Sequence, residues 1–223
     1  MRVVIVGYGE MLEALVAGVM DSKHDLTGVF RHENVLYNRL KRLFYDYTLP
    51  SGDFHLVKNL YIYDIIAPSV NSKKFIKEIK RLKADVIIVG SWSEKFSLKT
   101  INAPNIACIN VHPSLLPEYR GPNPYFRTIL NGADKTGVTF HLMTEKYDAG
   151  NILKQIEIPI SSDETGKSLR FKCTNVVKNN IAELLDNLAD EIRNSRPQQE
   201  NLATYQKQIT LAESILDFKN ETS

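Results

Sequence analysis

The stretch Arg2-Val3-Val4-Ile5-Val6-Gly7-Tyr8-Gly9-Glu10 opens the chain with a β-branched apolar run that leads into a glycine turn. A helical pattern follows through Met20, and its apolar residues recur at intervals that place them on one helix face: Leu12, Leu15, Val16 and Val19. Residues 25–30 then have the pattern of a second short strand. A strand, a glycine turn, a helix and another strand are typical of the start of a doubly wound α/β sheet.

The run Asp85-Val86-Ile87-Ile88-Val89-Gly90 is nearly all apolar, which indicates a parallel strand buried on both faces. Residues 106–111 repeat the pattern. Further expected elements are a helix over 73–83, a helix over 125–131, extended segments over 137–143 and 152–160, and one long helix over 164–192. The fold class that follows is α/β, with a doubly wound and mostly parallel sheet.

A length of 223 residues suits one sizeable domain with a small appendage. We expect a main domain over residues 1–192, then a linker and short C-terminal extension over 193–223. No apolar run approaches the roughly 18 residues of a membrane helix, and no signal peptide is recognisable, so a cytoplasmic protein is expected. A net charge of +2 does not demand a nucleic-acid partner. Cys108 lies in an apolar run and is expected to be a packed thiol.

The glycine turn is only half of a dinucleotide-binding fingerprint. The third glycine falls at Leu12, and the second strand leads into Arg31 instead of an acid that would hold a ribose. Glu10 lies where a helix N-terminus would receive a phosphate, and a carboxylate there competes with any anion. A tight strand-to-helix turn, without nicotinamide, is therefore expected.

Periodicity is lost between residues 31 and 58. This region either covers the sheet edge or is an insertion that contacts a large substrate, and both interpretations stay open. Its aromatic and basic residues are Tyr37, Phe44, Tyr45, Tyr47, Arg39, Lys41 and Arg42.

The most informative stretch is Asn110-Val111-His112-Pro113-Ser114-Leu115-Leu116-Pro117-Glu118-Tyr119-Arg120-Gly121-Pro122-Asn123-Pro124. It follows the carboxyl end of a buried strand, where open α/β sheets place their ligand sites. Asn110 and His112 project from the same side of an extended chain, so an amide and an imidazole there can bind a carbonyl oxygen and move a proton. If the turn at Asp148 reaches the same place, its carboxylate can fix the tautomer of His112 and raise its pKa. His141, within an alternating strand, is expected to be a packed or surface residue.

These residues carry a resemblance to a known family. Asn110-Val111-His112, Ser114-Leu115-Leu116-Pro117, Arg120-Gly121, residues 136–139 and Asp148-Ala149-Gly150 resemble, in order and spacing, the folate-dependent formyltransferases. The resemblance implies a Rossmann-like catalytic domain and transfer of a formyl group from 10-formyltetrahydrofolate to a primary amine, without a metal.

The resemblance also implies roles for individual residues. Asn110 would stabilise an oxyanion, His112 would shuttle protons, and Asp148 would hold His112. The folate pocket, built largely from backbone, would involve Glu94, Lys95, Phe96, Pro122, Thr144, Glu145, Lys146, Tyr147 and Asp148.

Three branches of the family accept different amines. The start of the chain and the run Arg120-Gly121-Pro122-Asn123-Pro124 look most like the sugar N-formyltransferases, which act on nucleotide-linked amino sugars for lipopolysaccharide O-antigens or similar glycans. Methionyl-tRNA formyltransferase is the alternative; the glycinamide ribonucleotide enzymes, a formyltetrahydrofolate hydrolase and a non-catalytic binding relative are less favoured. A homodimer is possible, and the base-stacking aromatic is Trp92 or Tyr205.

Overall fold

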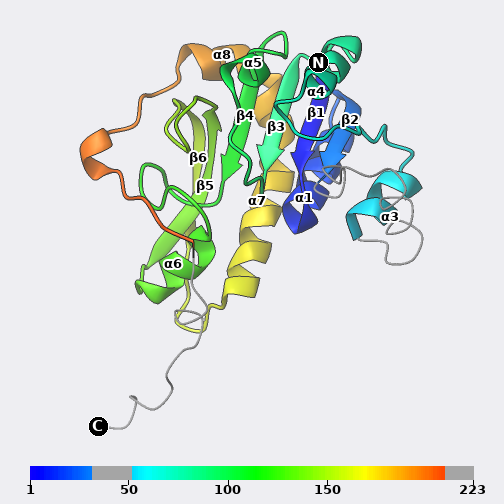
Figure 1. Ribbon diagram of the computed structural model, residues 1–223. Helices are drawn as coiled ribbons and strands as arrows, with labels where there is room; N and C mark the ends of the chain where they lie inside the picture. The colour runs from blue at the N-terminus through cyan, green and yellow to red at the C-terminus, as the bar shows by residue number, and fades with distance from the viewer. Residues whose placement is uncertain (32–51, 209–223) are drawn as a thin grey trace, which may run out of the picture.

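A six-stranded sheet forms the centre of the protein, whose computed structural model describes residues 1–31 and 52–208. The sheet runs in the order β2-β1-β3-β4-β5-β6, in which β5 and β6 are antiparallel to their neighbours and the other pairs are parallel (Figure 1). The bounds are β1 (Arg2–Gly7), β2 (Asp25–Arg31), β3 (Val86–Gly90), β4 (Ala107–His112), β5 (Lys135–Leu142) and β6 (Ile152–Pro159). The expected α/β class with a mostly parallel sheet is confirmed. The aromatic and basic residues at 37–47 lie outside the described residues.

Helices cover both faces of this sheet. They are α1 (Gly9–Met20), α3 (Gly52–Asn59), α4 (Lys73–Arg81), α5 (Leu98–Ile101), α6 (Pro124–Leu130), α7 (Gly166–Asp186) and α8 (Leu188–Arg193), with a 3₁₀ turn at Glu200–Leu202. In β1, Val3 and Ile5 pack against α1 and α7, whereas Val4 and Val6 face the cluster that contains α4. Because successive side chains point to opposite faces and both are covered, the strands are continuously apolar. In residues 1–31 and 52–208, no helix is long and apolar enough to cross a membrane.

The prediction of one unbroken helix over residues 164–192 was wrong. The helix is interrupted at Asn187, whose backbone N–H and side-chain Nδ2 both donate to the carbonyl of Glu183, at 3.1 and 3.0 Å. Asparagine side chains compete with the regular ladder for backbone groups and so favour helix ends. The chain turns there and continues as α8.

The pairing of β4 with β5 places polar side chains in register. Asn110 lies opposite His141, and His112 lies opposite Thr139. Side chains at directly opposed positions of neighbouring strands emerge on the same face, so each pair can interact. The carboxyl end of β4 therefore presents two imidazoles and an amide together.

The contact between α1 and α7 leaves no room for a side chain at Gly18. A Cβ built there lies 2.4 Å from Ile181 Cγ2 and 2.5 Å from the backbone oxygen of Lys178. We expect Gly18→Ala to lower the free energy of unfolding by about 1–3 kcal/mol, because overpacking outweighs the helix propensity of alanine. Gly166→Ala in α7, where a Cβ meets nothing within 4 Å, is the control and should not destabilise the protein. Urea unfolding measures both, and wild-type stability of Gly18→Ala would contradict this packing.

Candidate active site

His112 ends β4 and its imidazole is held between two loops. It is 5% exposed, and Nε2 lies 2.8 Å from the carbonyl oxygen of Tyr119. Since a carbonyl only accepts, Nε2 carries the proton and Nδ1 is left as the basic nitrogen. Nδ1 lies 3.7 Å from Asp148 Oδ1, which is ion-pair distance. The expectation that Asp148 sets the tautomer is therefore corrected, because the hydrogen bond that sets it goes to Tyr119.

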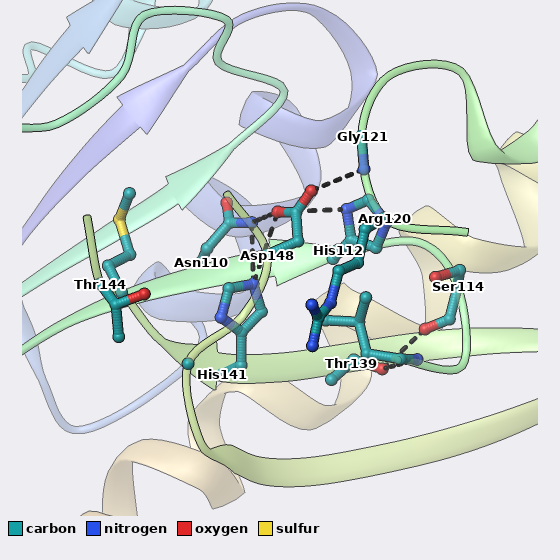
Figure 2. A network of polar contacts seen from close by, with 12 residues as sticks. Asn110, His112, Ser114, Arg120, Gly121, Thr139, His141, Thr144 and Asp148 are labelled. Carbon is teal, nitrogen blue, oxygen red and sulfur yellow. Dashed lines mark hydrogen bonds and ion pairs between the residues drawn. The ribbon is translucent and has the colours of Figure 1, made fainter. Parts of the chain in front are cut away.

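Asp148 lies at the centre of the polar network that Figure 2 shows. Its Oδ2 accepts a hydrogen bond from the backbone N–H of Gly121 at 2.8 Å, and its Oδ1 accepts one from Asn110 Nδ2 at 3.1 Å. The residue has a left-handed backbone with φ of 50°. The turn folds tightly onto β5, because a Cβ at Gly150 would lie 1.7 Å from the carbonyl oxygen of Leu142. The turn thus reaches the end of β4, as the sequence interpretation required.

The Asp148 carboxyl is ionised at neutral pH although it is largely buried. Burial by itself raises its pKa, but the His112 imidazole at ion-pair distance and the hydrogen bond from the N–H of Gly121 hold the pKa well below its usual range. A fixed negative charge therefore lies beside both imidazoles. A proton gained by His112 on Nδ1 is stabilised by that charge.

His141 belongs to this network, which sequence reasoning missed. Its side chain is buried, and its Nδ1 donates to the carbonyl of Leu142 at 2.9 Å. Its Nε2 is then an acceptor and receives a hydrogen bond from Asn110 Nδ2 at 3.1 Å. The residue does pack, as expected, but it also binds a candidate catalytic amide. Antiparallel pairing of the two strands, with Asn110 opposite His141, is the signal that would have found it.

The loop after β4 is held by hydrogen bonds to Thr139 of β5. Thr139 Oγ1 donates to the carbonyl of Ser114 at 2.6 Å and accepts from the N–H of Leu116 at 3.2 Å. Gln155 Nε2 donates to the carbonyl of Leu116 at 2.6 Å. These bonds hold the Ser-Leu-Leu-Pro run against β5, and Figure 2 shows Ser114 beside Thr139.

Two cavities meet at these side chains. The smaller, of about 40 Å³, is lined by most of the residues expected to bind folate: Glu94, Lys95, Phe96, Thr144, Glu145, Lys146, Tyr147 and Asp148. Pro122 does not line it and lies instead on the larger cavity, of about 610 Å³. Asn110 and Asp148 line both cavities, and His112 lines the larger one. The candidate catalytic groups thus lie where the two cavities meet.

The carboxylate of Glu94 is already bonded to the protein. Ser69 Oγ, the N–H of Val70 and Asn71 Nδ2 all donate to it, the last two at 3.2 and 3.1 Å. Its side chain therefore holds the loop after β3 in place. In the described part of the chain no group of three or more His, Cys, Asp or Glu side chains is arranged to hold a metal ion.

The N-terminus of α1 is occupied by an acid from another element. Both carboxylate oxygens of Asp53, at the start of α3, accept from the N–H of Gly9, at 2.9 and 3.0 Å. Asp53 is 5% exposed. Glu10 was expected to exclude an anion here, but it is exposed and Asp53 makes this contact. The position that would attract a phosphate is filled by the protein itself.

The lowered pKa of Asp148 predicts a pH-dependent contribution to stability. Asp148→Asn removes the charge, and we expect it to reduce the free energy of unfolding by about 3 kcal/mol at pH 7. The folded pKa lies below the unfolded value of about 3.9, so the wild-type advantage is present above that pH and shrinks as the pH falls below about 4. Urea unfolding at pH 7 and pH 3 measures the gap. An equal gap at both pH values would contradict the assignment.

Comparisons with known proteins agree with this geometry. Residues 1–185 match the family described as formyl transferase. A methionyl-tRNA formyltransferase from Thermotoga maritima is 30% identical over 221 residues, which are 99% of this chain and 69% of that protein. Solved structures share the fold, among them a sugar N-formyltransferase and HypX.

A sugar N-formyltransferase from a Shewanella species has a TM-score of 0.64 and 20% identity, covering 96% of this chain and 85% of that one. HypX from Aquifex aeolicus, in complex with tetrahydrofolic acid, has a TM-score of 0.70 and 18% identity, covering 99% of this chain and 32% of that one. The sheet has the fold of these structures, the Asn110-x-His112 pair ends β4, and the family match covers most of the chain. The protein therefore belongs to the formyltransferase family and is a folate-dependent one-carbon transferase.

Proposed function

We propose that this enzyme transfers a formyl group from 10-formyltetrahydrofolate to the amino group of a nucleotide-linked amino sugar. The observation that carries the proposal is the place of Asn110 and Asp148, which line both cavities. A donor in the smaller cavity and an acceptor in the larger one meet at the same side chains. Proximity of two bound reactants supplies a large part of such a rate enhancement.

Each candidate catalytic residue has a step in the proposed transfer. The acceptor nitrogen bonds to the formyl carbon, and the carbonyl oxygen gains negative charge that Asn110 Nδ2 stabilises by hydrogen bonding. His112 Nδ1 takes the proton of the attacking amine and returns one to the folate nitrogen as its bond to the formyl carbon breaks. Asp148 stabilises the imidazolium between those events.

Asn110 must exchange a partner for this to occur. Its amide nitrogen carries two protons, and it lies 3.1 Å from both Asp148 Oδ1 and His141 Nε2. When it binds, the formyl oxygen accepts a hydrogen bond from one of these two N–H groups. His141 is the neutral acceptor of the pair and the weaker partner, so the exchange there costs less.

The smaller cavity has a suitable lining for a pterin but must widen to hold one. Its apolar walls include Val89 and Phe96, and its polar lining comes largely from the turn at 144–148. A volume of about 40 Å³ holds water rather than a bicyclic ring. Residues 144–147 are exposed, and widening the cavity would move Tyr147, whose hydroxyl donates to the carbonyl of Ser93 at 3.3 Å.

The larger cavity suits a small acceptor. Its walls carry aromatic side chains together with Arg170, which lies over the ring of Tyr125. Trp92 and Tyr205, the two candidates for stacking on a nucleotide base, both line it. Because Asp53 fills the N-terminus of α1, a substrate phosphate is disfavoured there, which argues against a glycinamide ribonucleotide.

Methionyl-tRNA is the second candidate acceptor. The relative from Thermotoga maritima carries that name and matches 99% of this chain at 30% identity. A net charge of +2 supplies little of the phosphate attraction on which nucleic-acid binding depends. We therefore favour the nucleotide-linked amino sugar over methionyl-tRNA as the acceptor. The domain boundary at residue 192, a cytoplasmic location and a homodimer remain predictions.

An assay of tetrahydrofolate release separates these acceptors. The enzyme is given 10-formyltetrahydrofolate with dTDP- and UDP-linked amino sugars, with initiator methionyl-tRNA, or with no acceptor. Turnover with one amino sugar is the expected result. Turnover with the tRNA alone overturns the sugar assignment, and release without any acceptor identifies a hydrolase.

Removal of the proton carrier should greatly slow transfer without unfolding the protein. We expect His112→Ala to lower kcat by about 10³-fold, the range attributed to positioned acid–base groups. His55→Ala is the matched control, because His55 is exposed on α3 and lines neither cavity. Circular dichroism checks the fold, and substantial activity in a folded His112→Ala enzyme would refute the proposed mechanism.

A further inference from the structure

A segment near the end of the described chain reaches back to both loops of the candidate active site. This C-terminal strap (residues 196–206) follows α8 and runs beside β5 and β6 toward α6, as the orange part of the ribbon shows (Figure 1). Its backbone pairs with the loop after β4. The N–H of Arg120 donates to the carbonyl of Thr204 at 2.9 Å, and the N–H of Gln206 donates to the carbonyl of Arg120 at 2.7 Å.

Gln198, in the strap, joins the two loops through one side chain. Its Nε2 donates to the backbone carbonyls of Asp148 and Gly150, each at 2.8 Å. Its Oε1 accepts from Arg120 Nε and Nη2, at 3.1 and 2.8 Å. Both protons of the amide are directed at the Asp148 turn, and the oxygen is directed at the neighbouring loop. The orientation of the amide is fixed, because an inverted amide would place its NH₂ group against the donors of Arg120 and its oxygen against the two carbonyls.

Arg120 completes this connection. It is 8% exposed, and its Nη1 and Nη2 bind both carboxylate oxygens of Glu200, at 3.1 and 2.8 Å. On one side of it, the carbonyl of Tyr119 holds His112; on the other, the N–H of Gly121 binds Asp148. A displacement of Arg120 therefore moves the partners of both side chains.

The Asp148 turn needs an external support of this kind. Asp148 has a left-handed backbone, which is strained for a residue with a Cβ and persists only where surrounding contacts hold it. The carbonyls of Asp148 and Gly150 are the two backbone groups that Gln198 binds. The distance from Asp148 Oδ1 to His112 Nδ1 depends on the position of this turn.

We propose that Gln198 is a positioning residue for formyl transfer: its side chain clamps the Asp148 turn to the Arg120 loop and so keeps the carboxylate beside His112. The inference rests on the proposed function. Gln198 does not line either cavity, so it acts through Asp148 and Arg120 and not on substrate.

Gln198→Glu tests the clamp, with Gln199→Glu as a control of equal charge at the exposed neighbouring position. A carboxylate at 198 still accepts from Arg120 but faces two carbonyl oxygens that it cannot bind. We expect kcat to fall at least about tenfold, with the KM of both substrates within about threefold of wild type. Gln199→Glu should match the wild type. Gln198→Ala repeats the test without added charge, should the glutamate variant fail to fold.

Hydrogen exchange of the full chain gives a readout that needs no turnover. Amides of residues 144–151 and of Gly121 should lose protection in the Gln198 variants and keep it in Gln199→Glu. A folded variant with unchanged kcat, or with unchanged exchange at the turn, overturns the proposal. If the wild type transfers no formyl group to any acceptor, the proposed function fails separately, and the exchange result alone then decides whether Gln198 holds the turn.

Discussion

The carboxylate of Asp148 is the buried charge on which the arrangement of the site depends. Withdrawal of a carboxylate from water costs several kcal/mol unless hydrogen bonds and opposite charges offset the loss. The N–H of Gly121 and the amide of Asn110 supply the hydrogen bonds, and His112 lies at ion-pair distance. One charge thus sets the relative positions of two loops and a strand.

The turn that carries this charge has a strained backbone. The left-handed backbone of Asp148 and the contact of Gly150 with Leu142 fold a short turn back onto the end of β4. Strain of this kind at a functional site is maintained by the rest of the structure, here by Gln198 and the strap.

The sheet and the residues at the end of β4 were predictable from local signals. Runs such as residues 86–90 are apolar because both faces are covered, and Asn110 and His112 alternate on an extended strand. The tautomer of His112 was not predictable, because its partner is a backbone carbonyl whose position depends on a folded loop.

Long-range contacts account for the residues that were missed. His141 joins the site through strand register, Asp53 reaches Gly9 across 44 positions, and Gln198 reaches Asp148 across 50. None of His141, Asp53 and Gln198 lies in a sequence motif. From the sequence alone, each has the character of an exposed polar side chain, and only the tertiary fold buries it or gives it a partner. The break at Asn187 has a different cause, since a side chain competes with the helix ladder.

The two cavities share Asn110 and Asp148 but take most of their other walls from different parts of the chain, which in the proposed transfer separates the chemistry from the choice of acceptor. The smaller cavity is built from the ends of β3, β4 and β5 and from the turn that carries Asp148. The larger one adds walls from the start of α1, from α6 and α7, and from the strap at Tyr205. A substitution on these added walls alters the proposed acceptor space without touching the groups that hold the Asp148 charge. Tyr205 differs from the other residues of these walls, because it belongs to the same strap that clamps the Asp148 turn. If the proposed acceptor occupies this cavity, one large enough to displace the strap would also weaken the support of Asp148, because Gln198 belongs to the same strap.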